Sequence, residues 1–302
     1  MFGYEKCSLC ARSCGVNRAE GEMGYCKKSD KISLARAALH FWEEPPISGT
    51  RGSGAIFFSG CSLGCIFCQN EPISHGGLGV EVGGEGLASL CLSLEAQGAH
   101  NINFVTPTHY MPSVRSAIRE ARAKGLSVPT VYNTSAFDSA DALRQMEGDI
   151  DIYLPDFKYI REDLAARYSL APNYPSAAKA AIAEMVRQCG GPVFDGEGIL
   201  QRGVLVRILV LPGAVANAKL SLRYLYDTYG DRILYSIMRQ YTPKQGLPAP
   251  LHRKVTAAEY EEVCSYALRI GIREAFTQGA ESATEEYTPP FASLEGLENI
   301  GK

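Results

Sequence analysis

Residues 57–70 read FFSGCSLGCIFCQN and contain three cysteines in the spacing C-x3-C-x2-C. They follow the apolar run Ala55–Phe58, which predicts a buried strand. The thiolates of Cys61, Cys65 and Cys68 can ligate three irons of a 4Fe-4S cluster, whereas an electron-transfer cluster normally takes four cysteines. One iron is then left open for a reactant, as in metal sites that are catalytic rather than structural. We therefore expect a 4Fe-4S cluster with one open iron in this loop.

Two other interpretations of these three cysteines remain. They belong to a pool of ten, so the register can arise by chance, or they can form part of a zinc ribbon. The small residues Gly60, Ser62 and Gly64 favour the cluster, because they let the loop wrap closely and point N–H groups at the sulfides.

Outward from this loop, short apolar runs alternate with helical stretches, and such alternation makes right-handed βαβ units and a mostly parallel sheet. Six units predict an incomplete α/β barrel. Strands are expected at Ala55–Phe58, Asn101–Val105, Val128–Tyr132, Ile150–Leu154, Val204–Leu211 and Ile233–Met238. Helices are expected at Leu87–Gly98, Pro112–Lys124, Asp138–Met146, Tyr174–Gln188, Leu220–Tyr229 and Ala257–Leu268.

The pattern C-x3-C-x-aromatic-C, with Phe67 as the aromatic residue, resembles the hallmark of the radical S-adenosylmethionine (SAM) superfamily. The resemblance implies an open partial (β/α)6 TIM-like barrel of the radical SAM type. It implies that SAM binds the open iron with Phe67 beside its adenine. Reductive cleavage of SAM then yields a 5′-deoxyadenosyl radical that abstracts a substrate hydrogen. The cofactor carries this chemistry, while the protein positions the reactants and excludes water.

The resemblance covers about residues 52–245. Within the superfamily, the chain is similar to the activating enzymes of glycyl radical enzymes, such as pyruvate formate-lyase activating enzyme, and to their PflX-like branch. Superfamily members place a Gly-Gly-Glu segment at the second strand end, but Gly83-Gly84-Glu85 precedes a helix here and predicts a turn and a helix N-terminus instead. By resemblance, the SAM contacts come from strand ends at Thr106, Pro107, Thr108, Asn133, Thr134, Asp156, Lys158 and Arg207.

Three further residues are candidates for catalytic roles at the substrate. His109 and Tyr110 follow the second strand end, and Tyr241 follows the sixth strand. Polar residues gathered at the carboxyl ends of barrel strands are typical of an active site. Each of the three also has an ordinary structural interpretation as a hydrogen-bonding residue of the fold.

The first 45 residues form a Cys-rich segment with the spacing C-x2-C-x3-C-x11-C, and residues 46–302 form the expected barrel domain. Four thiolates suit tetrahedral zinc, which can clasp a segment too small to fold on its own core, and they equally suit a second 4Fe-4S cluster. We expect a metal site, with zinc preferred, at Cys7, Cys10, Cys14 and Cys26. The remaining cysteines, Cys91, Cys189 and Cys264, occur singly and are expected to be buried residues.

Composition excludes several classes of protein. The net charge is −3 and charged residues make up 21% of the chain, so no basic surplus favours duplex nucleic acid. No apolar run approaches the roughly 20 residues that span a bilayer, and the N-terminus lacks a signal-peptide pattern. We expect a cytoplasmic protein, in which clustered cysteines bind metal rather than form disulfides.

Three functions remain open from the sequence. The first is hydrogen abstraction from a small molecule, leading to lyase chemistry or a rearrangement, with a modified nucleobase such as queuine as one class of substrate. The segments Pro192–Arg202 and Tyr287–Leu297 are expected to close over such a molecule. The second is installation of a glycyl radical on a partner enzyme, and the third is a non-catalytic iron–sulfur or zinc scaffold. Either enzyme needs a one-electron donor such as flavodoxin or ferredoxin.

Overall fold

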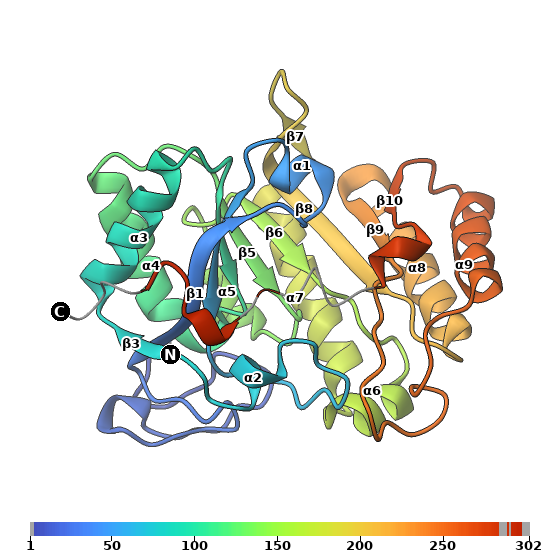
Figure 1. Cartoon of the computed structure of the whole chain (residues 1–302), viewed down its shortest axis with the longest axis horizontal. Coiled ribbons are helices and arrows are strands. Elements are labelled where there is room, and N and C mark those ends of the chain that lie inside the picture. The colour runs from blue at the N-terminus through green and yellow to red at the C-terminus, as the bar shows by residue number, and fades with distance from the viewer. Residues whose placement is uncertain (1–2, 284–288, 290, 298–302) are drawn as a thin grey trace.

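The computed structural model describes residues 3–283, 289 and 291–297, and a mixed sheet forms its centre (Figure 1). The strand order is β10-β9-β8-β6-β5-β4-β2-β1-β3, with β7 paired to β8. The strands are β1 (Ile32–His40), β2 (Ser53–Phe58), β3 (Val80–Val82), β4 (Ile102–Val105), β5 (Thr130–Thr134), β6 (Ile152–Pro155), β7 (Val193–Phe194), β8 (Leu200–Leu209), β9 (Leu234–Met238) and β10 (Ala275–Thr277).

All neighbouring strands from β2 to β10 along this order run parallel, whereas β1 is antiparallel to β2 and β3 is antiparallel to β1. The expected parallel α/β sheet is therefore confirmed. In the described part of the chain, the sheet path ends at β3 and β10, so closure into a partial barrel stays a prediction.

Helices connect successive parallel strands, as βαβ units require. Most of these helices begin with proline in the first turn or with a capping side chain, as at Thr256 and Glu259, which form a capping box. The helices are α1 (Pro45–Ser48), α2 (Glu71–Ser74), α3 (Gly84–Ala96), α4 (Met111–Ala123), α5 (Ala140–Arg144), α6 (Glu162–Ser169), α7 (Tyr174–Cys189), α8 (Val215–Tyr229) and α9 (Ala257–Ile270).

The two faces of the sheet carry different side chains because successive residues of a strand point to opposite faces. In β8, Val204 and Val206 pack into the large core beneath the outer helices, whereas Leu205 faces inward. Ile47 of α1 is fully buried against this inner set. Burial of one such side chain contributes about 1.5 to 3 kcal/mol. Helix α1 thus covers the inner face near the amino ends of the strands.

Strand β1 was not expected, because residues 1–45 show no clear periodicity. The structure places β1 in the sheet, so only the residues before Ile32 stand apart as a Cys-rich head, defined here as residues 3–31. Arg18 anchors this head. Its guanidinium is fully buried and donates to the backbone carbonyls of Lys28, Ser29 and His109. The last of these contacts ties the head to the β4 side of the sheet.

The segment 192–202, expected to close over a small molecule, lies elsewhere. It forms a hairpin of β7 with the beginning of β8, and Figure 1 shows this hairpin projecting from the edge of the molecule beside α1. In the expected tail segment, Tyr287 lies outside the described residues. The described part packs on β1 and β2, where the Phe291 and Phe57 rings are 5.4 Å apart and Glu295 pairs with Arg36.

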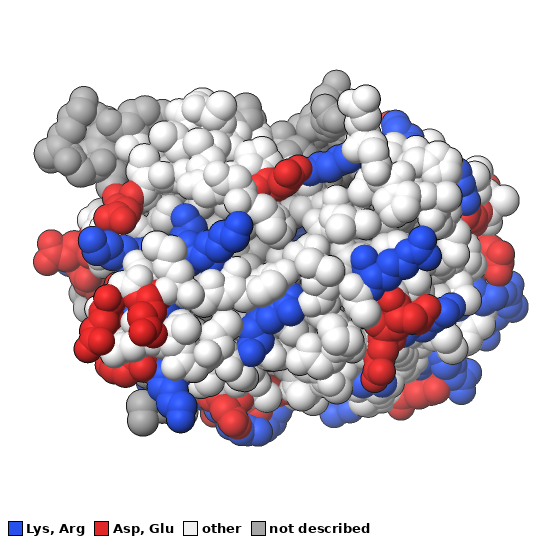
Figure 2. Space-filling model, turned by 90° about the horizontal axis from the view of Figure 1, so that it is seen from below, with Lys and Arg blue, Asp and Glu red and all other residues white. Residues whose placement is uncertain are grey.

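The surface carries charges of both signs. On the face shown in Figure 2, Lys and Arg side chains are interspersed with Asp and Glu. This distribution agrees with the small net charge of −3. No helix in the described part of the chain has the length and apolar character needed to cross a bilayer.

Candidate functional site

A cavity of about 220 Å³ lies at the carboxyl ends of the parallel strands. One wall comes from the loop after β2, defined here as the cysteine loop, residues 59–70. The facing wall comes from inward positions at or just beyond the ends of β5, β6 and β8. The first wall includes Cys61, Cys65, Phe67 and Cys68, and the second includes Asn133, Asp156, Lys158 and Arg207.

The cysteine loop is held by contacts on both sides. The Gly60 N–H donates to the Ile73 carbonyl at 2.8 Å, and the Cys65 and Ser169 side chains are 2.9 Å apart. Burial raises the pKa of the Cys65 thiol to about 11, although the nearby charge of Lys158 opposes this shift. Burial likewise raises the pKa of Cys61. Binding of a metal by these thiols therefore requires the release of their protons.

The residues of this loop fit a 4Fe-4S cluster by their chemistry and their place. Three thiols of one short loop line one cavity. Three cysteine ligands leave one iron of a 4Fe-4S cluster without a protein ligand. In the described residues, no three His, Cys, Asp or Glu side chains converge as ligands of a single metal ion. The three cysteine ligands of such a cluster bind different iron atoms, so they need not converge on a single ion.

The facing wall is a network of buried charges centred on Arg207. Its guanidinium donates to Asp156 at 2.7 Å, to Glu43 at 2.9 Å and to Asn133 at 2.7 Å. Lys158 completes the network with an ion pair to Asp156 at 2.6 Å. Burial opposes ionisation of Asp156, but the charges of Arg207 and Lys158 outweigh it and lower its pKa. The wall therefore presents two fixed cations to the cavity.

Two aromatic residues border the cavity next to the cysteine loop. The rings of Phe67 and Tyr241 meet edge to face, with centroids 5.8 Å apart. The Tyr241 hydroxyl donates to the Leu251 carbonyl at 2.6 Å, so it is already engaged away from the cavity. Tyr241 thus offers its ring to a bound molecule, while its hydroxyl stabilises the fold.

Of the residues that follow or end β4 and β5, some line the cavity and others are directed into the core. Thr106 lines the cavity in a left-handed conformation with φ of +61°, and its N–H donates to the Asn133 carbonyl. Pro107 and Thr108 follow it but do not line the cavity. Thr134 lies at the cavity edge, although its hydroxyl donates to the buried Asp138 at 2.6 Å.

The structure places His109 and Tyr110 away from the cavity, under the Cys-rich head. Both are buried, and neither lines the cavity. The His109 ring donates from Nε2 to the Ser59 carbonyl at 2.8 Å, and Arg18 lies beside both side chains. Burial, with the charge of Arg18, lowers the pKa of His109 to about 3. A histidine held neutral and enclosed in this way supports the head rather than transferring protons to a substrate.

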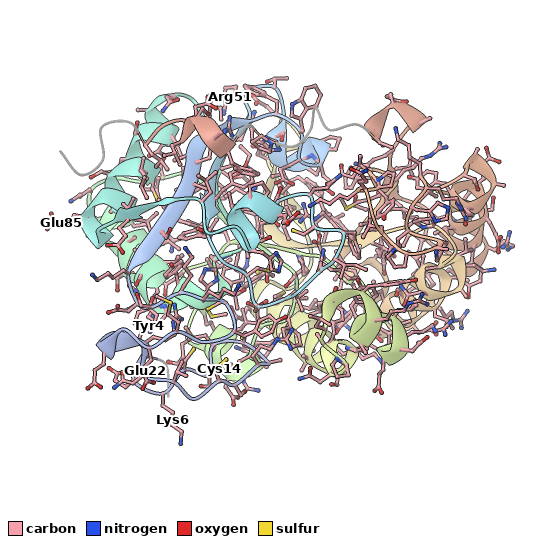
Figure 3. The ribbon with its side chains drawn as sticks, turned by 60° about the horizontal axis from the view of Figure 1, so that its bottom comes forward. Tyr4, Lys6, Cys14, Glu22, Arg51 and Glu85 are labelled. Carbon is pink, nitrogen blue, oxygen red and sulfur yellow. The ribbon has the colours of Figure 1, made fainter. Side chains whose placement is uncertain are left out.

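Gly83-Gly84-Glu85 begins α3, as the sequence indicates. Gly83 is the residue before the helix, and Glu85 lies in its first turn, where a carboxylate is favourable. Figure 3 shows Glu85 at the outer edge of the molecule.

The four head cysteines lie close enough together for their charges to interact. Burial, with smaller contributions from the nearby thiols of Cys26, Cys7 and Cys14, raises the pKa of Cys10 to about 12. Figure 3 shows Cys14 within the head, together with Tyr4, Lys6 and Glu22. The donor chemistry fits zinc or a second cluster, although no three of these thiols converge as ligands of one metal ion.

Sequence reasoning missed Glu43, His40 and Trp42, all of which line the cavity. The available signal was the pair of acidic residues next to apolar Pro-Pro-Ile, because a buried segment seldom carries a carboxylate without a partner.

No family model matches the chain. The uncharacterized protein MJ0674 of Methanocaldococcus jannaschii is 24% identical over 274 residues, which cover 87% of this chain and 75% of that protein. The crystal structure of Streptococcus suis SuiB bound to S-adenosylmethionine matches with a TM-score of 0.50 at 13% identity. The match covers 72% of this chain and 48% of SuiB, so this chain spans about half the matched protein. The chain therefore shares the α/β fold of SuiB over most of its described length.

Proposed function

We propose that this protein is a radical SAM enzyme that cleaves SAM and abstracts hydrogen from a small molecule. The observation that carries the proposal is the cavity in which Cys61, Cys65 and Cys68 face Arg207 and Lys158. A sulfur-rich wall together with the ion-paired cations Arg207 and Lys158 suits an iron–sulfur cluster and a ligand with a carboxylate. The shared fold with SuiB, crystallised with SAM, supports the proposal.

The thiolates of Cys61, Cys65 and Cys68 would hold a 4Fe-4S cluster, which would supply the electron for reductive cleavage of SAM. The protein's own residues then have defined tasks. Arg207 and Lys158 attract the SAM carboxylate by charge, and Asp156 keeps both cations in place. The Phe67 and Tyr241 rings offer an apolar surface to the adenine.

The cavity walls limit the substrate class. Tail residue Pro289 lines the cavity, and Phe291, two residues further on, is buried against Phe57 of the sheet. A tail packed beside the cavity favours a small molecule over a peptide loop of a partner enzyme. The hairpin of β7 and β8 adds nothing to this argument, because it does not line the cavity.

Anaerobic reconstitution with iron and sulfide, followed by dithionite and SAM, tests the proposal. We expect 5′-deoxyadenosine and methionine from the natural protein. The triple variant Cys61→Ala, Cys65→Ala, Cys68→Ala is expected to form neither. The single variant Cys264→Ala is the matched control, since Cys264 lies on α9 and does not line the cavity.

Each of the other functions has its own signature in this experiment. A reconstituted protein that binds iron but forms no 5′-deoxyadenosine is a scaffold, and the proposal then fails. A glycyl radical signal in electron paramagnetic resonance, seen only with a candidate partner enzyme, identifies an activating enzyme instead and overturns the small-molecule assignment.

We also propose a structural zinc ion at Cys7, Cys10, Cys14 and Cys26. Elemental analysis of the triple variant that lacks the cysteine-loop thiols tests this, because only the head then retains a full set of thiols. About one zinc per chain is expected. Iron and sulfide in place of zinc identify a second cluster and contradict the zinc assignment.

A further inference from the structure

Glu43 has an unusual position for a carboxylate. It lies between β1 and α1, where the chain turns across the inner face of the sheet, and its side chain is only 9% exposed. The turn is held on both sides. The Glu43 N–H donates to the Ser48 hydroxyl at 3.0 Å, and Asn101 donates to the Ile47 carbonyl at 2.7 Å. The turn thus places the Glu43 carboxylate on the inner face of the sheet, although Glu43 itself belongs to no strand.

The Glu43 carboxylate contacts three strands at once. One oxygen accepts from Asn103 of β4 at 3.1 Å and from Asn133 of β5 at 3.0 Å. The other oxygen accepts from Arg207 of β8 at 2.9 Å. Both oxygens are therefore engaged, and each partner is buried or nearly so. Asn133 is oriented by this contact, because its amide donates to Glu43 while its carbonyl oxygen accepts from Arg207.

Glu43 is one of three carboxylates around Arg207. Asp156 and Glu43 form ion pairs with it, and the charge of the neighbouring buried Glu44 also acts on it. Glu43 differs from Glu44 in that it accepts directly from Arg207 and from the amide of Asn133. Loss of Glu43 therefore releases Arg207 and Asn133 from their positions in the cavity wall.

We propose that Glu43 is a positioning residue of the SAM site, which holds Arg207 and Asn133 in the cavity wall. This inference rests on the proposed function and adds a residue from outside the parallel strands. Glu43 acts through Arg207 and Asn133, so its loss affects ligand affinity before it affects bond cleavage.

The experiment measures the SAM dissociation constant of the reconstituted protein by calorimetry, with the cluster oxidised so that no turnover occurs. Glu43→Gln is expected to raise the dissociation constant about tenfold or more, as loss of one partner of a buried charge pair does. Iron content and melting temperature are measured on the same samples. Glu44→Gln is the matched control, because Glu44 is also buried and its charge also acts on Arg207, but it is not among the hydrogen-bond partners of the Arg207 guanidinium and does not line the cavity. Its dissociation constant is expected to stay within about twofold.

A double variant separates positioning from general support of the fold. Glu43→Gln with Asn133→Asp exchanges the amide and the carboxylate. The carboxylate at position 133 can then accept from Arg207 and from the amide at position 43. We expect this exchange to recover most of the lost affinity. Glu43→Gln with lower melting temperature and unchanged SAM affinity assigns a purely structural role and overturns the inference.

The result for the natural protein distinguishes the two proposals. If the natural protein with a complete cluster does not bind SAM, the proposed function fails and the inference fails with it. If the natural protein binds SAM and Glu43→Gln binds it equally well, only the role of Glu43 is refuted.

Discussion

At the scale of single residues, the cavity contains a strained backbone position. Thr106 has φ of +61°, a conformation that costs a residue with a side chain about 1 to 2 kcal/mol and is rare for a β-branched one. A strained backbone conformation of this kind persists only where many surrounding contacts hold it in place, and it is frequent at binding sites. Here the strained residue joins the second strand end to the cavity, and its N–H reaches the Asn133 carbonyl.

Thr106→Gly is expected to keep or raise the free energy of unfolding, by up to about 1 kcal/mol, because glycine adopts this conformation without strain but loses more entropy on folding. Chemical denaturation measures the change. Thr228→Gly, in the exposed part of α8, is the control and is expected to destabilise the protein. Equal losses for the two variants would contradict the strain at Thr106.

His109 gives the protein a pH dependence of stability. Its pKa is lowered from 6.5 to about 3 in the fold, so between these values the unfolded chain binds a proton that the folded chain does not. The stability from neutral His109 is complete above about pH 6.5 and is lost as the pH falls toward about 3. From pH 7 to about pH 5, the natural protein is expected to lose roughly 2 kcal/mol more than His109→Gln, measured by urea unfolding. Parallel pH profiles for the two proteins would exclude His109 as the source.

At the scale of elements, the Cys-rich head and the cysteine loop support each other. Arg12 of the head donates to the Ser62 carbonyl at 3.0 Å. Gly60, with φ of +95°, leaves no space for a side chain, because an added Cβ stands 2.9 Å from the Cys26 carbonyl oxygen. The head therefore sets the path of the loop that carries the three thiols.

Gly60→Ala is expected to destabilise the protein and to lower its iron content on reconstitution, since the loop must move away from the head. Gly77→Ala is the matched control. Gly77 also has positive φ, +76°, but nothing lies within 4 Å of an added Cβ. The control is expected to lose only the backbone strain, about 1 kcal/mol, and to bind iron as the natural protein does. Similar iron loss in both variants would show that strain alone accounts for the effect.

At the scale of the whole molecule, the cavity depends on the parallel sheet. Strands distant in sequence end at the same edge, which brings residues of β5, β6 and β8 together with the cysteine loop. The hairpin of β7 and β8 is at the other end of β8, where β8 begins, while the cavity contacts come from Arg207 and Leu209 near its end.

Replacing residues 193–199 by two glycines is therefore expected to leave SAM affinity and 5′-deoxyadenosine formation within about twofold of the natural protein, because surface loops tolerate such changes. Calorimetry and product analysis measure the two quantities. A loss of affinity of about tenfold or more would mean that the hairpin reaches the cavity. It would then support the expectation that this segment closes over a bound molecule.

The sequence by itself determined the alternation of strands and helices and the cysteine loop after β2, because hydrophobic periodicity and short-range spacing are local properties. The family resemblance of the sequence indicated Asp156, Lys158 and Arg207, and the structure brings all three to the cavity. Only the tertiary structure decided that Glu43 joins them, that His109 lies under the head, and that β1 belongs to the sheet. Those outcomes depend on contacts between segments far apart in the chain, and no local pattern encodes which buried partner a carboxylate or an imidazole will meet.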